Sequence, residues 1–150
     1  MLPHVKAPEK RHLKASAIDL PVGKAERAVP VFVQKVHAGS IAGGHSYGGR
    51  VASMAATQVE YAALVLLSYP LHRPGHPEDL RTEHWPKITC PVMFLSGESD
   101  PFARIELLRS SVRRLPGAEL VTYPGVGHGL LPVIDAAMDR VAAFVRQLRP

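Results

Sequence analysis

Gly44-His45-Ser46-Tyr47-Gly48 stands between a short apolar run, Ser40-Ile41-Ala42, and a helix-like run over residues 50–56. A serine with glycines two positions before and two positions after it, between a strand and a helix, is typical of a sharp turn that exposes the hydroxyl group, and both glycines are expected to remove side chains that would collide there. The pattern therefore predicts a strand, a turn and a helix in this order. It makes Ser46 a candidate nucleophile and the backbone N–H of Tyr47 a candidate donor to an oxyanion.

Two later apolar runs end in residues that can complete such a site. Pro91-Val92-Met93-Phe94-Leu95 is followed by Asp100, and the run over residues 118–123 is followed by a glycine-rich loop that carries His128. A carboxylate that orients an imidazole, which in turn takes the proton of a serine, is the arrangement that serine hydrolases use. The sequence therefore predicts that Asp100 is the acid and His128 the general base for Ser46.

Each of the three residues also has a plain structural interpretation. Ser46 fits an ordinary turn serine. Asp100, followed by Pro101, fits the N-cap of a helix with proline at its first position. His128, between two glycines, fits a solvated loop histidine. The spacing of the motifs favours the catalytic interpretation and leaves these alternatives open.

The same segments resemble small α/β-hydrolases of the dienelactone-hydrolase-like kind, in particular the group related to a regulatory subunit of the NSL histone-acetyltransferase complex. The resemblance implies a serine-hydrolase fold with Ser46 as nucleophile, Asp100 as acid and His128 as base, in the chain order of that fold. It implies no particular substrate, and some members of the group resemble non-catalytic scaffolds. The matching segments are residues 43–55, 68–75 with 80–84, 97–102 and 125–129, within a stretch from about Asp19 to the end.

The chain departs from this family fold before Ser46. In the wider fold a loop after an early strand, often with a His-Gly or Gly-Gly pair, lends the second N–H of the oxyanion hole. No such loop is recognisable before Ser46. Since the loss of one donor costs about 10²–10³ in rate, we expect weak activity or, as an alternative, an inactive interaction module. A true start upstream of Met1 is a third alternative.

The order of strand-like and helix-like runs predicts one domain over residues 1–150, with residues 1–14 as an irregular arm and a short strand around residues 15–18. We expect an α/β fold with a doubly wound, mostly parallel sheet flanked by helices and lacking the N-terminal strands of the family. The missing strands would leave an unpaired sheet edge, which favours a homodimer. An early helical pattern over residues 23–36 contains Pro30, which predicts a kink or a later start. The two later helices are predicted from the apolar stripes Ile105, Leu108, Val112, Leu115 and Ile134, Met138, Val141, Val145, Leu148.

Composition argues against several classes of function. The chain is 46% hydrophobic and 21% charged, as in globular proteins, and its formal net charge of +5 is dispersed rather than clustered, so no nucleic-acid partner is expected. No apolar run approaches the roughly 20 residues of a membrane span, and the start does not resemble a secretory signal. We therefore expect a cytoplasmic protein without a membrane partner. Cys90 is interpreted as a buried structural thiol.

The loop over residues 71–87 is rich in proline and histidine, and we expect it to form the rim of a shallow, open pocket. Its metal-binding residue types fit no compact zinc spacing, so no metal site is predicted. Trp85 is expected to pack the rim onto the sheet, and Tyr47 to wall the pocket. The expected partner is a small acyl substrate, and no cofactor is required. The metal-binding types in this loop are His72, His76, Glu78, Asp79 and His84.

Overall fold

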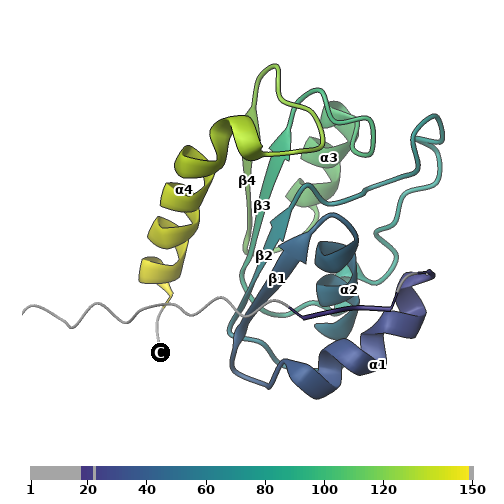
Figure 1. Ribbon diagram of the computed structural model, residues 1–150, viewed down its shortest axis with the longest axis vertical. Helices are drawn as coiled ribbons and strands as arrows, with labels where there is room; N and C mark the ends of the chain where they lie inside the picture. The colour runs from purple at the N-terminus through teal and green to yellow at the C-terminus, as the bar shows by residue number, and fades with distance from the viewer. Residues whose placement is uncertain (1–17, 22, 149–150) are drawn as a thin grey trace, which may run out of the picture.

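The computed structural model describes residues 18–21 and 23–148. Four parallel strands form one sheet in the order β1-β2-β3-β4, and helices cover both of its faces (Figure 1). This arrangement confirms the predicted fold class. The predicted irregular arm and most of the predicted short strand lie outside the described residues. The strands are β1 (Ile41–His45), β2 (Ala63–Leu67), β3 (Val92–Gly97) and β4 (Ala118–Tyr123), and the helices are α1 (Ala25–Lys35), α2 (Tyr47–Ala55), α3 (Ile105–Arg113) and α4 (Ile134–Gln147), with short 3₁₀ turns η1 (Trp85–Lys87) and η2 (Leu131–Val133).

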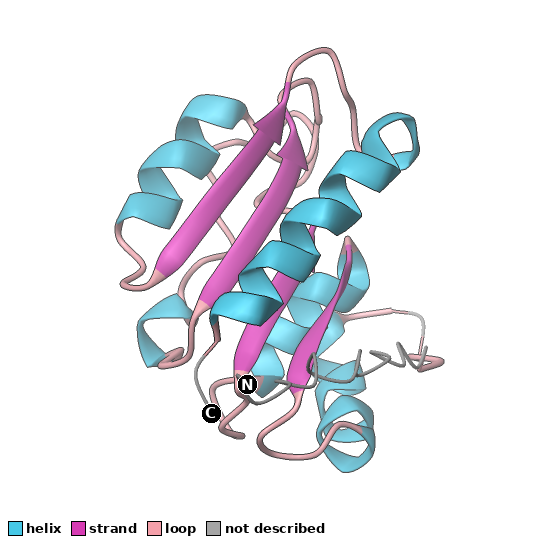
Figure 2. Ribbon diagram, turned by 90° about the vertical axis from the view of Figure 1, so that its left-hand side faces the viewer, coloured by secondary structure: helices cyan, strands magenta, loops and turns pink. Residues whose placement is uncertain are grey.

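The two faces of the sheet carry separate apolar clusters. Successive side chains of a strand point to opposite faces, so Leu64 and Leu66 lie in the cluster with α1, α2 and α3, whereas Ala63 lies in the cluster with α4. Figure 2 shows α4 crossing the face of the sheet opposite to α2. Every residue of β3 is buried, as expected of a central strand covered on both sides. Full burial of a leucine or phenylalanine contributes about 1.5–3 kcal/mol, so these two layers hold the strand ends in place.

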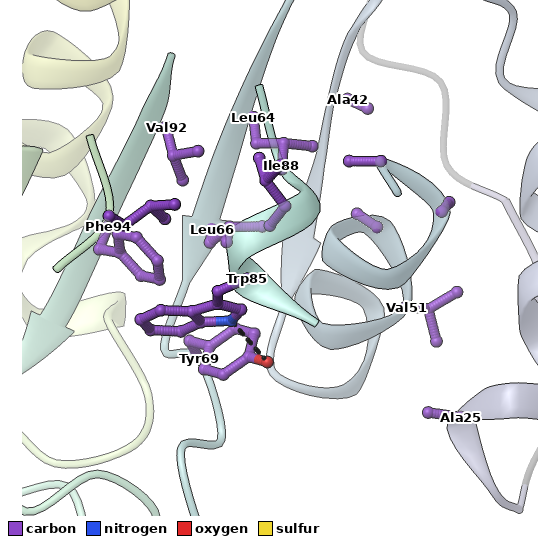
Figure 3. Close-up of a cluster of buried hydrophobic side chains, with 14 of the residues drawn as sticks. Ala25, Ala42, Val51, Leu64, Leu66, Tyr69, Trp85, Ile88, Val92 and Phe94 are labelled. Carbon is purple, nitrogen blue, oxygen red and sulfur yellow. Dashed lines mark hydrogen bonds between the residues drawn. The ribbon is translucent and has the colours of Figure 1, made fainter. Parts of the chain in front are cut away.

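The loop over residues 71–87 closes the end of the first cluster. Trp85 is buried and packs against Tyr69, with 5.3 Å between ring centroids, and against Phe94, with 5.1 Å (Figure 3). Its indole N–H donates to the Tyr69 hydroxyl at 3.2 Å. The prediction that Trp85 packs this loop onto the sheet is therefore confirmed.

Two helices differ from the sequence predictions. Pro30 lies inside α1 without ending it. Proline has no N–H to donate to the carbonyl of Glu26 four residues earlier. Both residues are exposed, so the missing hydrogen bond lies on the solvent side of the helix. In α4 the predicted stripe is confirmed only in its later part: Val141, Val145 and Leu148 pack against the sheet. Ile134 and Met138 are instead 37% and 40% exposed, and Ala137 and Phe144 are buried. Several apolar positions share this helix, and packing against the sheet selects among them.

No helix within the described residues is both long enough and apolar enough to cross a membrane.

Candidate active site

Ser46 occupies the turn between β1 and α2. Its backbone has φ 53° and ψ −120°, a conformation that residues other than glycine rarely adopt. The turn is held at both sides: the Ser46 N–H donates to the Leu67 carbonyl at 2.8 Å, and its carbonyl accepts from the Arg50 N–H at 3.1 Å. The predicted strand, turn and helix are therefore present, and the surrounding hydrogen bonds maintain the strained serine.

The glycines around Ser46 serve the turn differently from what the sequence suggested. A Cβ atom at Gly44 would lie 2.5 Å from the Gly48 carbonyl carbon, so no side chain fits there. At Gly48 itself a Cβ atom would have no neighbour within 4 Å, whereas at Gly49 it would lie 2.8 Å from the Gly44 carbonyl oxygen. Close approach of the strand and helix backbones thus requires glycine at positions 44 and 49. The expectation that Gly48 avoids a collision was wrong.

Ser46, His128 and Asp100 form a continuous series of hydrogen bonds. Ser46 Oγ lies 2.7 Å from His128 Nε2, and His128 Nδ1 lies 2.8 Å from Asp100 Oδ2. The Asp100 side chain is fully buried, and that of His128 is about a quarter exposed. The structure therefore brings together three residues that are 28 and 54 positions apart along the chain, at the shared carboxyl edge of the sheet.

Close packing of two loops places the carboxylate beside the imidazole. The Ser99 N–H donates to the Val126 carbonyl at 2.9 Å. Gly97, the last residue of β3, leaves room for that approach, because a Cβ atom there would collide with the carbonyls of Val126 and Gly127. The loops after β3 and β4 are consequently one packed unit, and Asp100 and His128 are positioned together.

Asp100 is not the N-cap of a helix. Helix α3 begins five residues later, at Ile105, with Arg104 before it. Asp100 Oδ1 instead accepts the N–H of Phe102 at 2.8 Å, which is a local Asx-type turn. That bond leaves the other carboxylate oxygen directed to His128, so the turn orients the acid rather than starting a helix.

Three residues that support this series were not predicted from the sequence to do so. The Phe102 ring packs on the His128 ring, with 4.5 Å between centroids. The Nε2 of His45 donates to the His128 carbonyl at 3.2 Å. His72 is buried; its Nδ1–H donates to the Arg73 carbonyl at 2.9 Å, and its Nε2 accepts the Arg104 N–H at 3.0 Å. Of the three, only His45 could have been predicted from the sequence, because it lies next to Ser46. The other two are brought to the site by the tertiary structure.

A cavity of about 950 Å³ opens beside Ser46. Tyr47 lines it, as predicted, and the Tyr47 hydroxyl donates to the Pro21 carbonyl at 2.9 Å. As the first residue of α2, Tyr47 has a backbone N–H without a partner inside the helix. The opposite walls come from the start of α1, from Pro70 and Arg81, and from Phe102. The site therefore has a hydroxyl, which is hydrogen-bonded to an imidazole, and a helix N–H without an intrahelical partner at one border of a space that can hold a small molecule.

The histidine-rich loop offers one grouping of metal-binding residue types among the described residues. Ligand atoms of His76, Glu78 and Asp79 lie within 4.8 Å of one another, and all three residues are exposed. His76 contacts Glu78 at 3.3 Å, and Asp79 lies 3.8 Å from Arg73. These are ordinary contacts between exposed polar side chains, which contribute little to stability.

Cys90 lies half-buried before β3 and is a free thiol. Burial raises the pKa of this thiol above its usual range. It is therefore protonated at neutral pH and a poor nucleophile.

A parallel sheet between helices, with serine after β1, aspartate after β3 and histidine after β4, defines the α/β-hydrolase class of fold. The model of the alpha/beta hydrolase domain family matches residues 9–143, and the chain belongs to this family.

Solved structures show the same fold. A predicted CIB-like hydrolase from Thermoplasma acidophilum superposes with a TM-score of 0.68 at 18% identity, over 84% of this chain and 61% of that one. Est1E from Butyrivibrio proteoclasticus, with ferulic acid bound, gives 0.65 at 18% identity, over 85% and 70%. A thermophilic esterase from Thermogutta terrifontis, with malate bound, gives 0.66 at 17% identity, over 89% and 76%. The chain thus spans about three fifths of the first of these proteins.

Proposed function

We propose that this protein is a serine hydrolase of the esterase type that cleaves a small ester or a related acyl compound. The observation that carries the proposal is the hydrogen-bonded series from Ser46 through His128 to Asp100 beside an open cavity. Within the family we assign it to the dienelactone-hydrolase-like members, near the group related to the NSL regulatory subunit, from the matching segments around Ser46 and over residues 68–84.

We assign a role to each group on the basis of the geometry. An ionised Asp100 only accepts hydrogen bonds, so His128 carries its proton on Nδ1 and presents a bare Nε2 to Ser46. Nε2 takes the hydroxyl proton as Oγ bonds to the acyl carbon, and returns it to the leaving alcohol. The Tyr47 N–H binds the oxyanion meanwhile. Water, deprotonated by the same Nε2, then releases the acid and restores Ser46.

Covalent labelling with a fluorophosphonate tests the proposal. We expect one adduct, located by mass spectrometry on Ser46, together with measurable hydrolysis of p-nitrophenyl acetate. Ser46→Ala abolishes both signals. Ser53→Ala is the matched control, because Ser53 also contacts a histidine but is buried within α2, and this variant keeps the adduct. A folded wild-type protein that stays unlabelled overturns the assignment.

The edge of the sheet favours a second candidate function, an interaction module that pairs with its own copy. Among the described residues, β1 has a strand partner on one side only. A groove of about 780 Å³ runs beside this edge, bordered by Ile41 and Gly43 and by Val141 and Val145 of α4. An open strand edge is normally covered. Light scattering distinguishes the two: a dimer that Ile41→Lys dissociates supports pairing through β1, and a monomer at all concentrations rejects it.

A further inference from the structure

We propose that the substrate carries a negatively charged group, in the plainest case a carboxylate, which Arg50 and Arg81 bind in the cavity beside Ser46. This inference rests on the proposed hydrolase function and adds the charge of the molecule that the site accepts.

The walls of the cavity are strongly cationic. Among the residues that the structure describes, four basic ones line it, and Glu26 is the one acidic residue of its lining. The helices α1 and α2 both begin at this cavity, and helix N-termini favour anions. A neutral ester gains nothing from such walls, whereas an anionic one is attracted to the space that Ser46 borders. The basic residues are Lys24, Arg27, Arg50 and Arg81.

Arg50 belongs to the same structural unit as Ser46. It follows Ser46 by four residues, one helical turn, and its N–H donates to the Ser46 carbonyl at 3.1 Å. Its side chain is only 17% exposed, and its buried Nε has no hydrogen-bond partner in the described part of the chain. Glu26 lies 3.8 Å from its Nη2 but is itself 61% exposed. This guanidinium is therefore held near the nucleophile with donors left to offer.

Arg81 is fixed from the other side of the cavity. The Arg81 N–H donates to the Leu71 carbonyl at 2.7 Å, and its carbonyl accepts the Tyr69 hydroxyl at 2.7 Å. Tyr69 is in turn buried against Trp85 (Figure 3). No carboxylate lies within 4.0 Å of the Arg81 guanidinium among the described residues. Arg81 Nη1 donates to the Pro70 carbonyl at 3.5 Å, a long hydrogen bond. The fold thus places a second cation on a rigid backbone without a carboxylate partner among the described residues.

The positive charges of the two guanidinium groups repel each other. Burial first, and then the positive charge of Arg50, lower the pKa of Arg81 from its ordinary value. Like charges that are partly removed from water raise the free energy of the empty site, and an anion between them removes that cost. Arginine is suited to this role because its planar donors match a carboxylate. A purely structural pair of arginines would be expected to have a carboxylate partner each, whereas among the described residues only Arg50 has one, the exposed Glu26 at 3.8 Å.

A matched pair of esters tests the inference. 4-Acetoxybenzoate is an anion, and its methyl ester is neutral and carries the same acetyl group. We expect Arg50→Gln and Arg81→Gln each to lower the ratio of kcat/KM for the anion to that for the neutral ester by about tenfold or more, the effect of one lost charge-assisted hydrogen bond. Arg81→Lys, which keeps the charge, should lose less. Arg113→Gln removes the same charge from an exposed position on α3 and should leave the ratio unchanged.

Binding to Ser46→Ala separates this inference from the proposed function. Calorimetry should show that this variant binds 4-acetoxybenzoate at least about tenfold more tightly than the methyl ester, and that adding Arg81→Gln removes the difference. Selective binding without hydrolysis by the wild type rejects the hydrolase and keeps the anion site. Hydrolysis with ratios that neither arginine variant changes keeps the hydrolase and overturns the anion site. Thermal melting confirms that each variant is folded.

Discussion

Helix α2 carries two serine–histidine hydrogen bonds that look alike and differ in chemistry. Ser46 Oγ lies 2.7 Å from His128 Nε2 at the start of the helix, and Ser53 Oγ lies 2.8 Å from His84 Nε2 two turns later. Ser46 borders the cavity in a strained turn, whereas Ser53 is completely buried in a regular helix. Distance alone does not separate a candidate nucleophile from a structural contact.

The two serine–histidine pairs differ in which atom donates the hydrogen. The Ser53 hydroxyl donates to the Arg50 carbonyl at 2.6 Å, so its hydrogen is already used and His84 must donate from Nε2. In the other pair Asp100 accepts the Nδ1–H of His128, which leaves Nε2 to accept from Ser46. The carboxylate therefore decides the tautomer, and the tautomer decides whether the imidazole can act as a base.

Replacing each histidine gives the largest expected contrast. His128→Ala removes the base, and we expect the rate of p-nitrophenyl acetate hydrolysis to fall by at least about 10³-fold. His84→Ala loses only a structural hydrogen bond, so the folded fraction should keep its rate within about threefold. Rates per folded molecule, with folding followed by circular dichroism, check both. Equal losses in the two variants would remove the distinction between the pairs.

Asp100→Asn tests the tautomer argument with an intermediate effect. The amide NH₂ can donate to Nδ1 and so favours the wrong tautomer, and we expect kcat to fall by about 10²–10⁴-fold. Asp79→Asn is the control, because Asp79 is an exposed carboxylate on the loop over residues 71–87. If Asp100→Asn kept the wild-type kcat, the carboxylate would have no role in orienting His128.

The smallest expected effect is on stability below neutral pH. Burial lowers the pKa of His84 below its ordinary value near 6.5. The unfolded chain therefore takes up this proton at a higher pH than the folded protein does, so the stabilisation is present above about pH 6.5 and is lost as the pH falls below it. Urea unfolding at pH 7.5 and 5.5 should show a smaller decrease in the free energy of unfolding for His84→Gln than for the wild type. An equal decrease in both proteins would contradict the assignment.

Much of the fold could be predicted from local patterns. The apolar run over residues 118–123 became β4 at its predicted bounds, and the run that begins at Pro91 became β3. Such runs are informative because a parallel strand covered on both faces needs apolar residues throughout. The buried face of α4 was predicted only in part: Val141, Val145 and Leu148 pack against the sheet, whereas Ile134 and Met138 are exposed. A helix with apolar residues at many positions offers several faces, and only the sheet selects one.

The candidate site was partly predictable for a related reason. Ser46, Asp100 and His128 each follow a strand, and the carboxyl ends of parallel strands meet at one edge of a sheet. Arg50 could have been predicted by the same reasoning, because it lies one helical turn after Ser46. Phe102 and His72 were not, because their contacts depend on how two loops fold against each other.

The sequence by itself determined the strands, the turn at Ser46 and the residue types that reach the edge of the sheet, because these follow from local periodicity and from glycine placement. Only the tertiary structure decided which histidine accepts a proton from which serine, and that two arginines share one cavity whose one acidic side chain among the described residues, Glu26, is exposed. Hydrogen-bond direction and charge pairing depend on distances of a few ångströms between residues that are remote in the chain, and no local pattern records them.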